Sequence, residues 1–144
     1  MDPVRFDTKI AILLRDDLAA WQELNVTAFL ASGLATDDRL ADEPGMTGEP
    51  YRDADGTTYL AMFRQPVLVF TADAGTLAAA RARAVERQLR VAVYIEEIFA
   101  TGHDEANRAE VARFPAAQLN LVGLALHGPK NVVDRITKAA TLHR

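Results

Sequence analysis

The chain alternates four short apolar runs with segments of helical periodicity, and this alternation constrains its fold more than any other feature. The runs lie at residues 9–15, 65–71, 90–95 and 119–126 and are bounded by charged or turn-forming residues. Such runs are typical of strands that are buried on both faces. A sheet of this kind needs helices on both sides, so the pattern predicts an α/β protein.

The segments between the runs carry apolar residues at helical spacing. From Ala20 onward, Leu24, Ala28 and Ala31 share the face expected to meet the core, with Val26, Phe29 and Leu30 widening it, and Gly33 is expected to end the helix. Further helices are predicted at 74–88, with Thr76 as its cap, at 103–113, and at 132–140 after a break at Gly128-Pro129. The order of elements predicts a three-layer α/β/α sandwich around a mixed sheet.

Residues 35–50 interrupt this alternation with a long polar stretch. We expect an irregular surface loop, a kind of segment that often forms a lid or binding loop. Residues 51–54 and 57–60 are β-prone and flank Asp55-Gly56, a pair that favours a tight turn. The sequence therefore predicts a β-hairpin inserted between the first helix and the second long strand.

Length and composition restrict the class of protein further. The 144 residues fit one domain, 1–144, and the absence of cysteine excludes disulfides and thiol catalysis. No signal-peptide stretch or membrane-spanning run is present, so a cytoplasmic protein without membrane contact is expected. Residues 1–56 hold 12 acidic and 5 basic residues, whereas 57–144 hold 8 acidic and 11 basic residues. This distribution, with a stripe of Arg83, Arg87 and Arg90 expected on one helix face, favours at most weak nucleic-acid binding.

The common catalytic motifs are missing. Neither a dinucleotide fingerprint nor a phosphate-binding loop follows any predicted strand, and the single serine, Ser32, lies within a helix. The three histidines show no ligand spacing that requires a metal. We therefore expect no metal and no cofactor.

Two regions remain as candidates for a ligand site, because ligands of open α/β sheets bind outside the carboxyl ends of the strands. The first is the end of the first strand and the helix that follows it, with five candidate ligand-binding residues: Arg15, Asp17, Gln22, Asn25 and Thr27. The second follows the third long strand, where adjacent Glu96 and Glu97 offer a general base. The same residues are equally consistent with purely structural roles, in which they cap a turn or helix or lie on the surface as solvated acids.

Two stretches resemble a known family. The run 9–15 followed by Asp16-Asp17-Leu18, and the tail 119–138 with its Gly128-Pro129 turn, are similar to the first strand and last strand–helix unit of type II peptidyl-tRNA hydrolases. Residues 9–33 and the segment from Tyr51 to Pro66 resemble a bacterial domain-of-unknown-function family, number two thousand, that shares this fold. The resemblance covers most of the chain except 35–50 and implies the hydrolase fold with an inserted hairpin.

The resemblance also implies roles for individual residues. The Asp-Ala-Gly-x-Thr loop of the hydrolases aligns with residues 97–101, which makes Glu97 and Thr101 the candidate catalytic pair. The lysine-rich element of the hydrolases aligns with residues 21–25, which contain no lysine. The implied peptidyl-tRNA hydrolase activity is therefore expected to be weak.

Three functions follow from these observations. The first is binding of a small or peptide-like ligand at a cleft between the ends of strands one and three, with hydrolase-like chemistry in which Arg15 would hold an anionic group. The second is a non-catalytic homodimeric interaction module, which an exposed apolar patch around Tyr51, Tyr59 and Phe63 would favour. Weak peptidyl-tRNA hydrolysis is the third.

Overall fold

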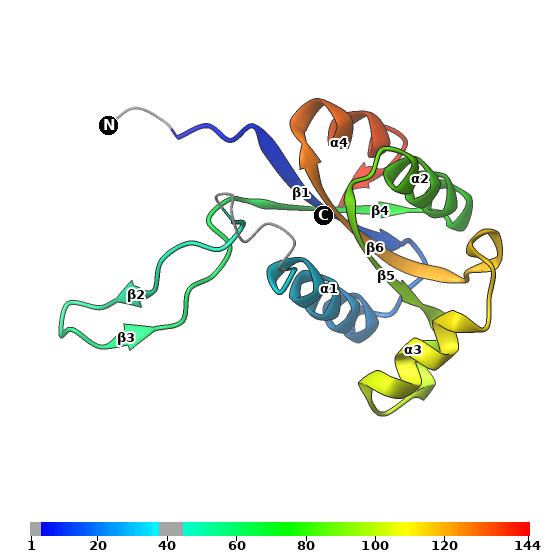
Figure 1. Cartoon of the computed structure of the whole chain (residues 1–144), viewed down its shortest axis with the longest axis horizontal. Helices are drawn as coiled ribbons and strands as arrows, with labels where there is room; N and C mark the ends of the chain where they lie inside the picture. The colour runs from blue at the N-terminus through cyan, green and yellow to red at the C-terminus, as the bar shows by residue number, and fades with distance from the viewer. Residues whose placement is uncertain (1–3, 38–44) are drawn as a thin grey trace.

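The computed structural model describes residues 4–37 and 45–144. Its centre is a five-stranded mixed sheet with the strand order β5-β6-β1-β4-β7 (Figure 1). The strands are β1 (Thr8–Arg15), β4 (Val67–Ala72), β5 (Arg90–Ile95), β6 (Leu121–Pro129) and β7 (Thr141–Leu142).

The directions of the strands determine which chain segments meet at each end of the sheet. β1 is parallel to β4 and antiparallel to β6, and β6 is antiparallel to β5. The carboxyl ends of β1, β4 and β5 therefore lie at the same end of the sheet, together with the start of β6. β6 separates β1 from β5, so the cleft expected between strands one and three is not formed by neighbouring strands.

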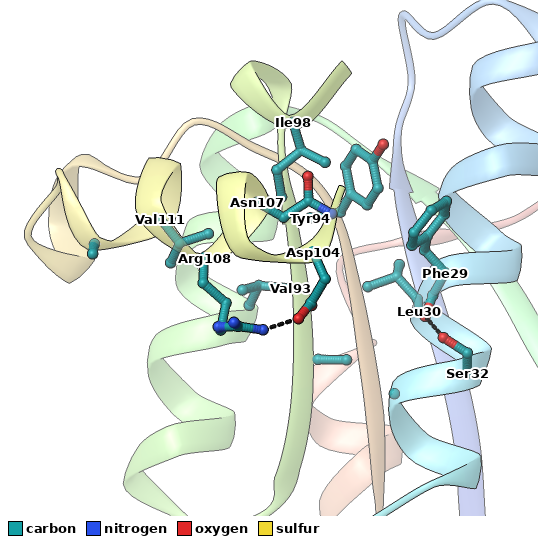
Figure 2. A pocket seen from close by; sticks show the side chains of 13 residues that line it. Phe29, Leu30, Ser32, Val93, Tyr94, Ile98, Asp104, Asn107, Arg108 and Val111 are labelled. Atoms are coloured by element: carbon teal, nitrogen blue, oxygen red, sulfur yellow. Dashed lines mark hydrogen bonds and ion pairs between the residues drawn. The ribbon is translucent and has the colours of Figure 1, made fainter. Parts of the chain in front are cut away.

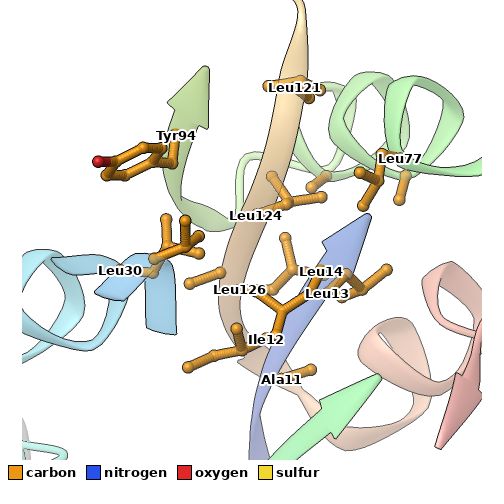
Figure 3. Packing of buried hydrophobic residues seen from close by; sticks show 14 of the residues in the cluster. Ala11, Ile12, Leu13, Leu14, Leu30, Leu77, Tyr94, Leu121, Leu124 and Leu126 are labelled. Carbon is orange, nitrogen blue, oxygen red and sulfur yellow. The ribbon is translucent and has the colours of Figure 1, made fainter. Parts of the chain in front are cut away.

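Helices cover both faces of the sheet, as the apolar runs predict. α1 (Ala20–Ala35) lies on one face, and α2 (Ala74–Glu86) and α4 (Lys130–Ile136) lie on the other (Figure 1). Side chains from β1 and β6 fill the core between these layers (Figure 3). The fully buried ones include Ile10, Ile12, Leu13, Leu124 and Leu126.

Two further segments lie outside the three layers. After β5 the chain forms a 3-10 helix, η1 (Glu96–Ala100), then α3 (Asp104–Ala112) and a short 3-10 turn, η2 (Ala116–Gln118). The predicted hairpin consists of β2 (Tyr51–Arg52) and β3 (Thr58–Tyr59), and it projects away from the body of the molecule (Figure 1). Of the predicted loop 35–50, residues 38–44 lie outside the described part of the chain.

The structure corrects the prediction for α1. Its core face consists of Val26, Leu30 and Leu34, whereas Leu24 is 74% exposed and Ala28 is exposed. Gly33 does not end the helix, which continues to Ala35. The glycine instead lies where the helix passes close to β5, since a Cβ atom there would lie 3.1 Å from the Ala92 side chain. α1 is apolar on both sides, so its sequence periodicity did not distinguish the inner face from the outer one.

The C-terminal predictions also need correction. β6 continues through Gly128 and Pro129 because these residues pair with Lys9 and Thr8 of β1. The last helix ends at Ile136, and Thr141 and Leu142 then add an edge strand to β4.

Two predictions for the second helix are wrong. The cap of α2 is Asp73, whose carboxylate accepts a 2.7 Å hydrogen bond from the backbone N–H of Thr76. The expected arginine stripe does not form, because the helix ends before residue 90. Arg90 lies in β5 and forms a 3.4 Å ion pair with Asp37 after α1.

Candidate functional site

The strand ends carry a compact cluster of charged and amide groups centred on Arg15. Its guanidinium donates to Asp17 at 2.6 Å, to the Asn120 side chain at 3.3 Å and to Glu96 at 3.5 Å. Asn120 in turn donates to Glu96 at 2.7 Å. The hydrogen bond with Asp17 raises the pKa of Arg15, and the same bond lowers the pKa of Asp17. The cluster joins the ends of β1 and β5 across the start of β6.

This geometry bears on the predicted role of Arg15. The pairing of Arg15 with Asp17 leaves Glu97 free of that arginine, and Glu96 is the acid that approaches it. Because three acceptors already surround the guanidinium, its geometry is that of a structural link between strand ends. One oxygen of Glu97, Oε2, is buried and has no hydrogen-bond partner among the described residues.

The three candidates on α1 have different surroundings. The Gln22 side chain accepts a 2.9 Å hydrogen bond from the backbone N–H of Ala19 at the start of the helix. The Thr27 hydroxyl donates to the carbonyl of Glu23 within the helix at 2.7 Å. Asn25 reaches across to β5, where its side-chain amide donates to the hydroxyl of Tyr94 at 3.4 Å. Of the three, only Asn25 faces the groove described next.

A groove runs between α1 on one side and η1 and α3 on the other (Figure 2). It consists of two adjoining lobes of about 460 and 290 Å³ that share Phe29, Tyr94, Ile98, Asp104 and Asn107. Asn25 and Thr101, predicted from separate regions of the sequence, both line the smaller lobe. The structure does not place Arg15, Asp17 or Glu97 among the residues that line either lobe.

Aromatic side chains form the walls of the smaller lobe. The rings of Trp21 and Phe99 meet edge to face at 5.7 Å, and those of Phe29 and Tyr94 do so at 5.8 Å. The rings of Tyr94 and Phe99 lie 5.2 Å apart and join the two pairs. Four rings in contact give the groove an apolar wall of fixed shape.

The larger lobe lies on the free edge of β5. Ala92 and Tyr94 point to the α1 face of the sheet, as the contact of Ala92 with Gly33 shows, and Val93 points to the opposite face, yet all three line this lobe. A cavity lined from both faces of a strand must lie along the edge of that strand. β5 pairs with β6 on its other side. In residues 4–37 and 45–144, no hydrogen bond is described to the outer edge of β5.

Polar groups are placed at intervals along the groove. The Thr101 hydroxyl donates to the Asn107 side chain, and Arg108 pairs with Asp104 at the rim (Figure 2). His103 caps α3 by accepting a 3.3 Å hydrogen bond from the backbone N–H of Ala106. Burial raises the pKa of Tyr94, which further favours the protonated hydroxyl. Amide and hydroxyl groups beside aromatic walls suit a ligand that itself carries amide groups.

Other kinds of site find no support in the described chain. Residues 4–37 and 45–144 contain no group of three or more histidine, aspartate or glutamate side chains placed to hold a metal ion. Within the same residues, no helix has the length and apolar character needed to cross a membrane.

Sequence reasoning missed several groove residues. Tyr94 stands out only as the one residue with a polar group within an otherwise apolar stretch of β5, and this signal could have drawn attention to it. Phe29 was assigned to the core, whereas it is half exposed beside Tyr94. Asn107 and Asp104 carry no local signal, because their position depends on how α3 lies against η1.

The fold and groove define a small mixed α/β protein with an open sheet edge in a partly aromatic cleft. The chain belongs to the DUF2000 family of proteins of unknown function, whose model matches residues 8–144. It is similar to a solved structure of a protein of unknown function, Atu0240 from Agrobacterium tumefaciens strain C58. The two are 47% identical, with a TM-score of 0.87, over 97% of this chain and 100% of the other. A search of curated proteins finds no match.

Proposed function

We propose that the protein binds an extended peptide or a peptide-like ligand in the groove between α1 and α3. The observation that carries this proposal is the outer edge of β5, with which no other strand of the described residues pairs and whose residues line the larger lobe. In an antiparallel ladder every second residue directs its N–H and C=O away from the partner strand. An extended backbone that enters the groove satisfies those groups by adding a strand to β5.

The walls of the groove supply selectivity for side chains. A ligand strand beside β5 would direct alternate side chains toward α1 and away from it. Those directed toward α1 would meet Phe29 and Tyr94, and the amides of Asn25 and Asn107 would pair with the ligand's own amide groups. The combined volume falls within the range of sites that bury a small ligand.

The sequence resemblance of residues 9–18 and 119–138 to type II peptidyl-tRNA hydrolases implies a ligand of this chemistry, since a peptide is one half of the substrate of that family. The proposal is limited to binding. Glu97, the candidate base, does not line the groove, and Arg108 is the one cation among the lining residues. Phosphate groups of a tRNA would therefore find little compensation here.

The test uses a defined library of acetylated, amidated pentapeptides and the full-length protein. We expect binding peptides to shift the backbone amide resonances of residues 90–95 and the side-chain amide of Asn25 in NMR spectra. The matched control is the same peptide N-methylated at alternate amides, which keeps its side chains but cannot pair with a strand. N-methylation is expected to abolish binding.

Protein variants separate the groove from the rest of the surface. Phe29→Ala removes part of the wall and is expected to weaken binding about tenfold or more. Val85→Ala truncates an exposed apolar residue on α2, on the other face of the sheet, and is expected to have no effect. Equal binding of methylated and unmethylated peptides, or shifts confined to other elements, would contradict the proposal.

A further inference from the structure

A second feature is a pair of surfaces that carry exposed apolar side chains: the hairpin β2–β3, and the outer face of α1, which borders the groove at Trp21 and continues away from it through Leu24 and Ala28. Every residue from 51 to 60 is exposed, including Tyr51, Tyr59 and Leu60. We call residues 49–62 the arm. A lone two-stranded hairpin is marginally stable in water, so an arm without contacts to its own body calls for another surface.

The arm is nevertheless built to hold one shape. At its tip, the Asp53 carboxylate accepts hydrogen bonds of 3.0 Å from the backbone N–H groups of Asp55 and Thr57, and a 2.8 Å bond from the Tyr59 hydroxyl. At its base, Gly48 and Arg64 donate backbone hydrogen bonds of 2.8 and 2.7 Å to the carbonyls of Met62 and Met46. A pre-organised arm loses little entropy when it docks.

The outer face of α1 has the character of an interface core. Trp21 and Leu24 are 60% and 74% exposed, and Ala28, Ser32 and Ala35 extend the same stripe toward the end of the helix. Trp21 and Ser32 lie where this face borders the groove. Glu23 is the single charged residue in α1, and it is paired with His143. A water-facing helix without free charge is unusual, because surface helices keep polar residues on the solvent side. Depletion of charge marks the centre of protein interfaces.

We infer that the arm of one copy packs across the outer face of α1 of a second copy, in a two-fold symmetric homodimer. A symmetric dimer brings the two surfaces together twice, arm on α1 and α1 on arm, so both unpartnered patches are covered. The patches lie on one chain but do not touch within it, since the arm projects from the body (Figure 1).

The available area agrees with such a dimer. Trp21, Leu24, Tyr51, Tyr59, Leu60 and Met62 are each at least half exposed. A fully buried aromatic side chain covers roughly 150–250 Å², so each of these half-exposed side chains has about 100 Å² of surface available for burial in a contact. With the alanines of α1 and the arm backbone, each chain would cover on the order of 800 Å², the amount typical of one partner in a stable interface.

Sedimentation equilibrium of the full-length protein tests the oligomeric state directly. We expect a dimer at micromolar concentration. Leu24→Lys on α1 and Leu60→Glu on the arm are each expected to raise the dimer dissociation constant about tenfold or more, because each places an unpaired charge in the contact. Val85→Lys introduces a charge at an exposed apolar site on α2 and is expected to leave the dimer intact.

Mixing the two variants distinguishes this arrangement from others. A heterodimer of the Leu24→Lys and Leu60→Glu chains has one unaltered arm–helix contact and one in which opposite charges meet. We therefore expect the mixture to dimerise more tightly than either variant alone. Leu24→Gln and Leu60→Thr serve as a milder pair if a charged variant fails to fold.

Three results would overturn the inference. These are a monomeric wild-type protein, a dimer that neither substitution weakens, and a mixture no tighter than its components. The last would point to helix–helix or arm–arm contact instead. The substituted residues, Leu24 and Leu60, do not line the groove, so these outcomes are distinguishable from a failure of peptide binding there.

Discussion

Val26 of α1 packs so closely against Gly123 of β6 that a Cβ atom on the glycine would lie 2.5 Å from the Val26 Cγ1 atom. Leu30 Cδ1 would be the next contact, at 2.9 Å. Both side chains are buried, and valine has one preferred rotamer in a helix, so neither can easily move aside. Tyr94 lies opposite Gly123 in the neighbouring strand. The glycine thus sets how near α1 lies to the floor of the groove.

Gly123→Ala is expected to destabilise the protein by about 1–3 kcal/mol, because an extra methyl group overpacks the contact between α1 and β6. Urea unfolding followed by circular dichroism measures the change. Gly102→Ala is the matched control, since a Cβ atom at Gly102 would meet nothing within 4 Å. Equal stability of the two variants would show that α1 can shift without cost.

The long strands could be predicted because each is a run of apolar residues, although only β1 and β6 are buried along most of their length. β1 and β5 lie at the predicted positions, whereas β6 begins two residues later than predicted and ends three residues later. β7 is two residues long and is held by pairing with Phe70 and Thr71, so it leaves no periodic pattern. The insertion of β6 between β1 and β5 depends on long-range pairing, which a local pattern does not encode.

The candidate site could be predicted only in part, for the same reason. Asn25 and Thr101 follow strand ends on the chain, and the shared direction of β1 and β5 brings both to one groove. Glu97 and Arg15 follow the same rule, but their side chains lie elsewhere: Arg15 turns to Asp17 and Glu96. Which way a strand-end side chain turns is decided by its neighbours in space.

Arg15→Met tests the strand-end cluster. The substitution keeps an unbranched apolar stem but removes three hydrogen bonds, two of them to carboxylates that would then repel each other. Because the Asp17 and Glu96 side chains are 62% and 52% exposed, solvent screens these contacts, and we expect a loss of stability of about 1 kcal/mol or less in urea unfolding. Arg83→Met, at an exposed position on α2, is expected to change stability little. An unchanged stability of Arg15→Met would show that the cluster contributes nothing measurable to folding.

The contribution of Asp17 to the stability of the protein depends on pH. Its hydrogen bond from Arg15 lowers its pKa in the folded protein, so its contribution to stability is present above the pKa of the unfolded chain, about 3.9. That contribution is lost as the pH falls through the folded pKa. We expect the stability difference between wild type and Asp17→Asn to shrink below about pH 4. Unfolding midpoints measured across this range provide the check, and a constant difference would contradict it.

The contribution of His143 to stability has the opposite pH dependence. Its ring contacts the Glu23 carboxylate, and its backbone N–H donates to Val69 at 2.8 Å, so the end of the chain is linked to both α1 and β4. The hydrogen bond with Glu23 raises the pKa of His143. The resulting stabilisation is complete below the unfolded pKa of about 6.5 and is lost as the pH rises through the folded pKa.

NMR titration of the His143 ring measures that pKa directly. Glu23→Gln is expected to return it toward the ordinary value, and the stability difference between wild type and variant should disappear at alkaline pH. His103→Asn serves as a control, because that residue caps α3 and lies outside this contact. An unchanged His143 pKa in Glu23→Gln would show that the pair does not persist in solution.

Gly56 and Asp53 are expected to control the shape of the arm without affecting the core. Gly56 has a φ of +88°, a conformation that costs an alanine about 1–2 kcal/mol, and Asp53 binds the backbone of the turn. In the monomer the arm is exposed, so at concentrations below the dimer dissociation constant Gly56→Ala and Asp53→Ala should accelerate amide exchange at Asp55 and Thr57 while the urea midpoint of the core stays unchanged. Ala54→Ser, at an exposed site in the same turn, should alter neither quantity. A lower urea midpoint in either variant would mean that the arm is coupled to the core of its own chain.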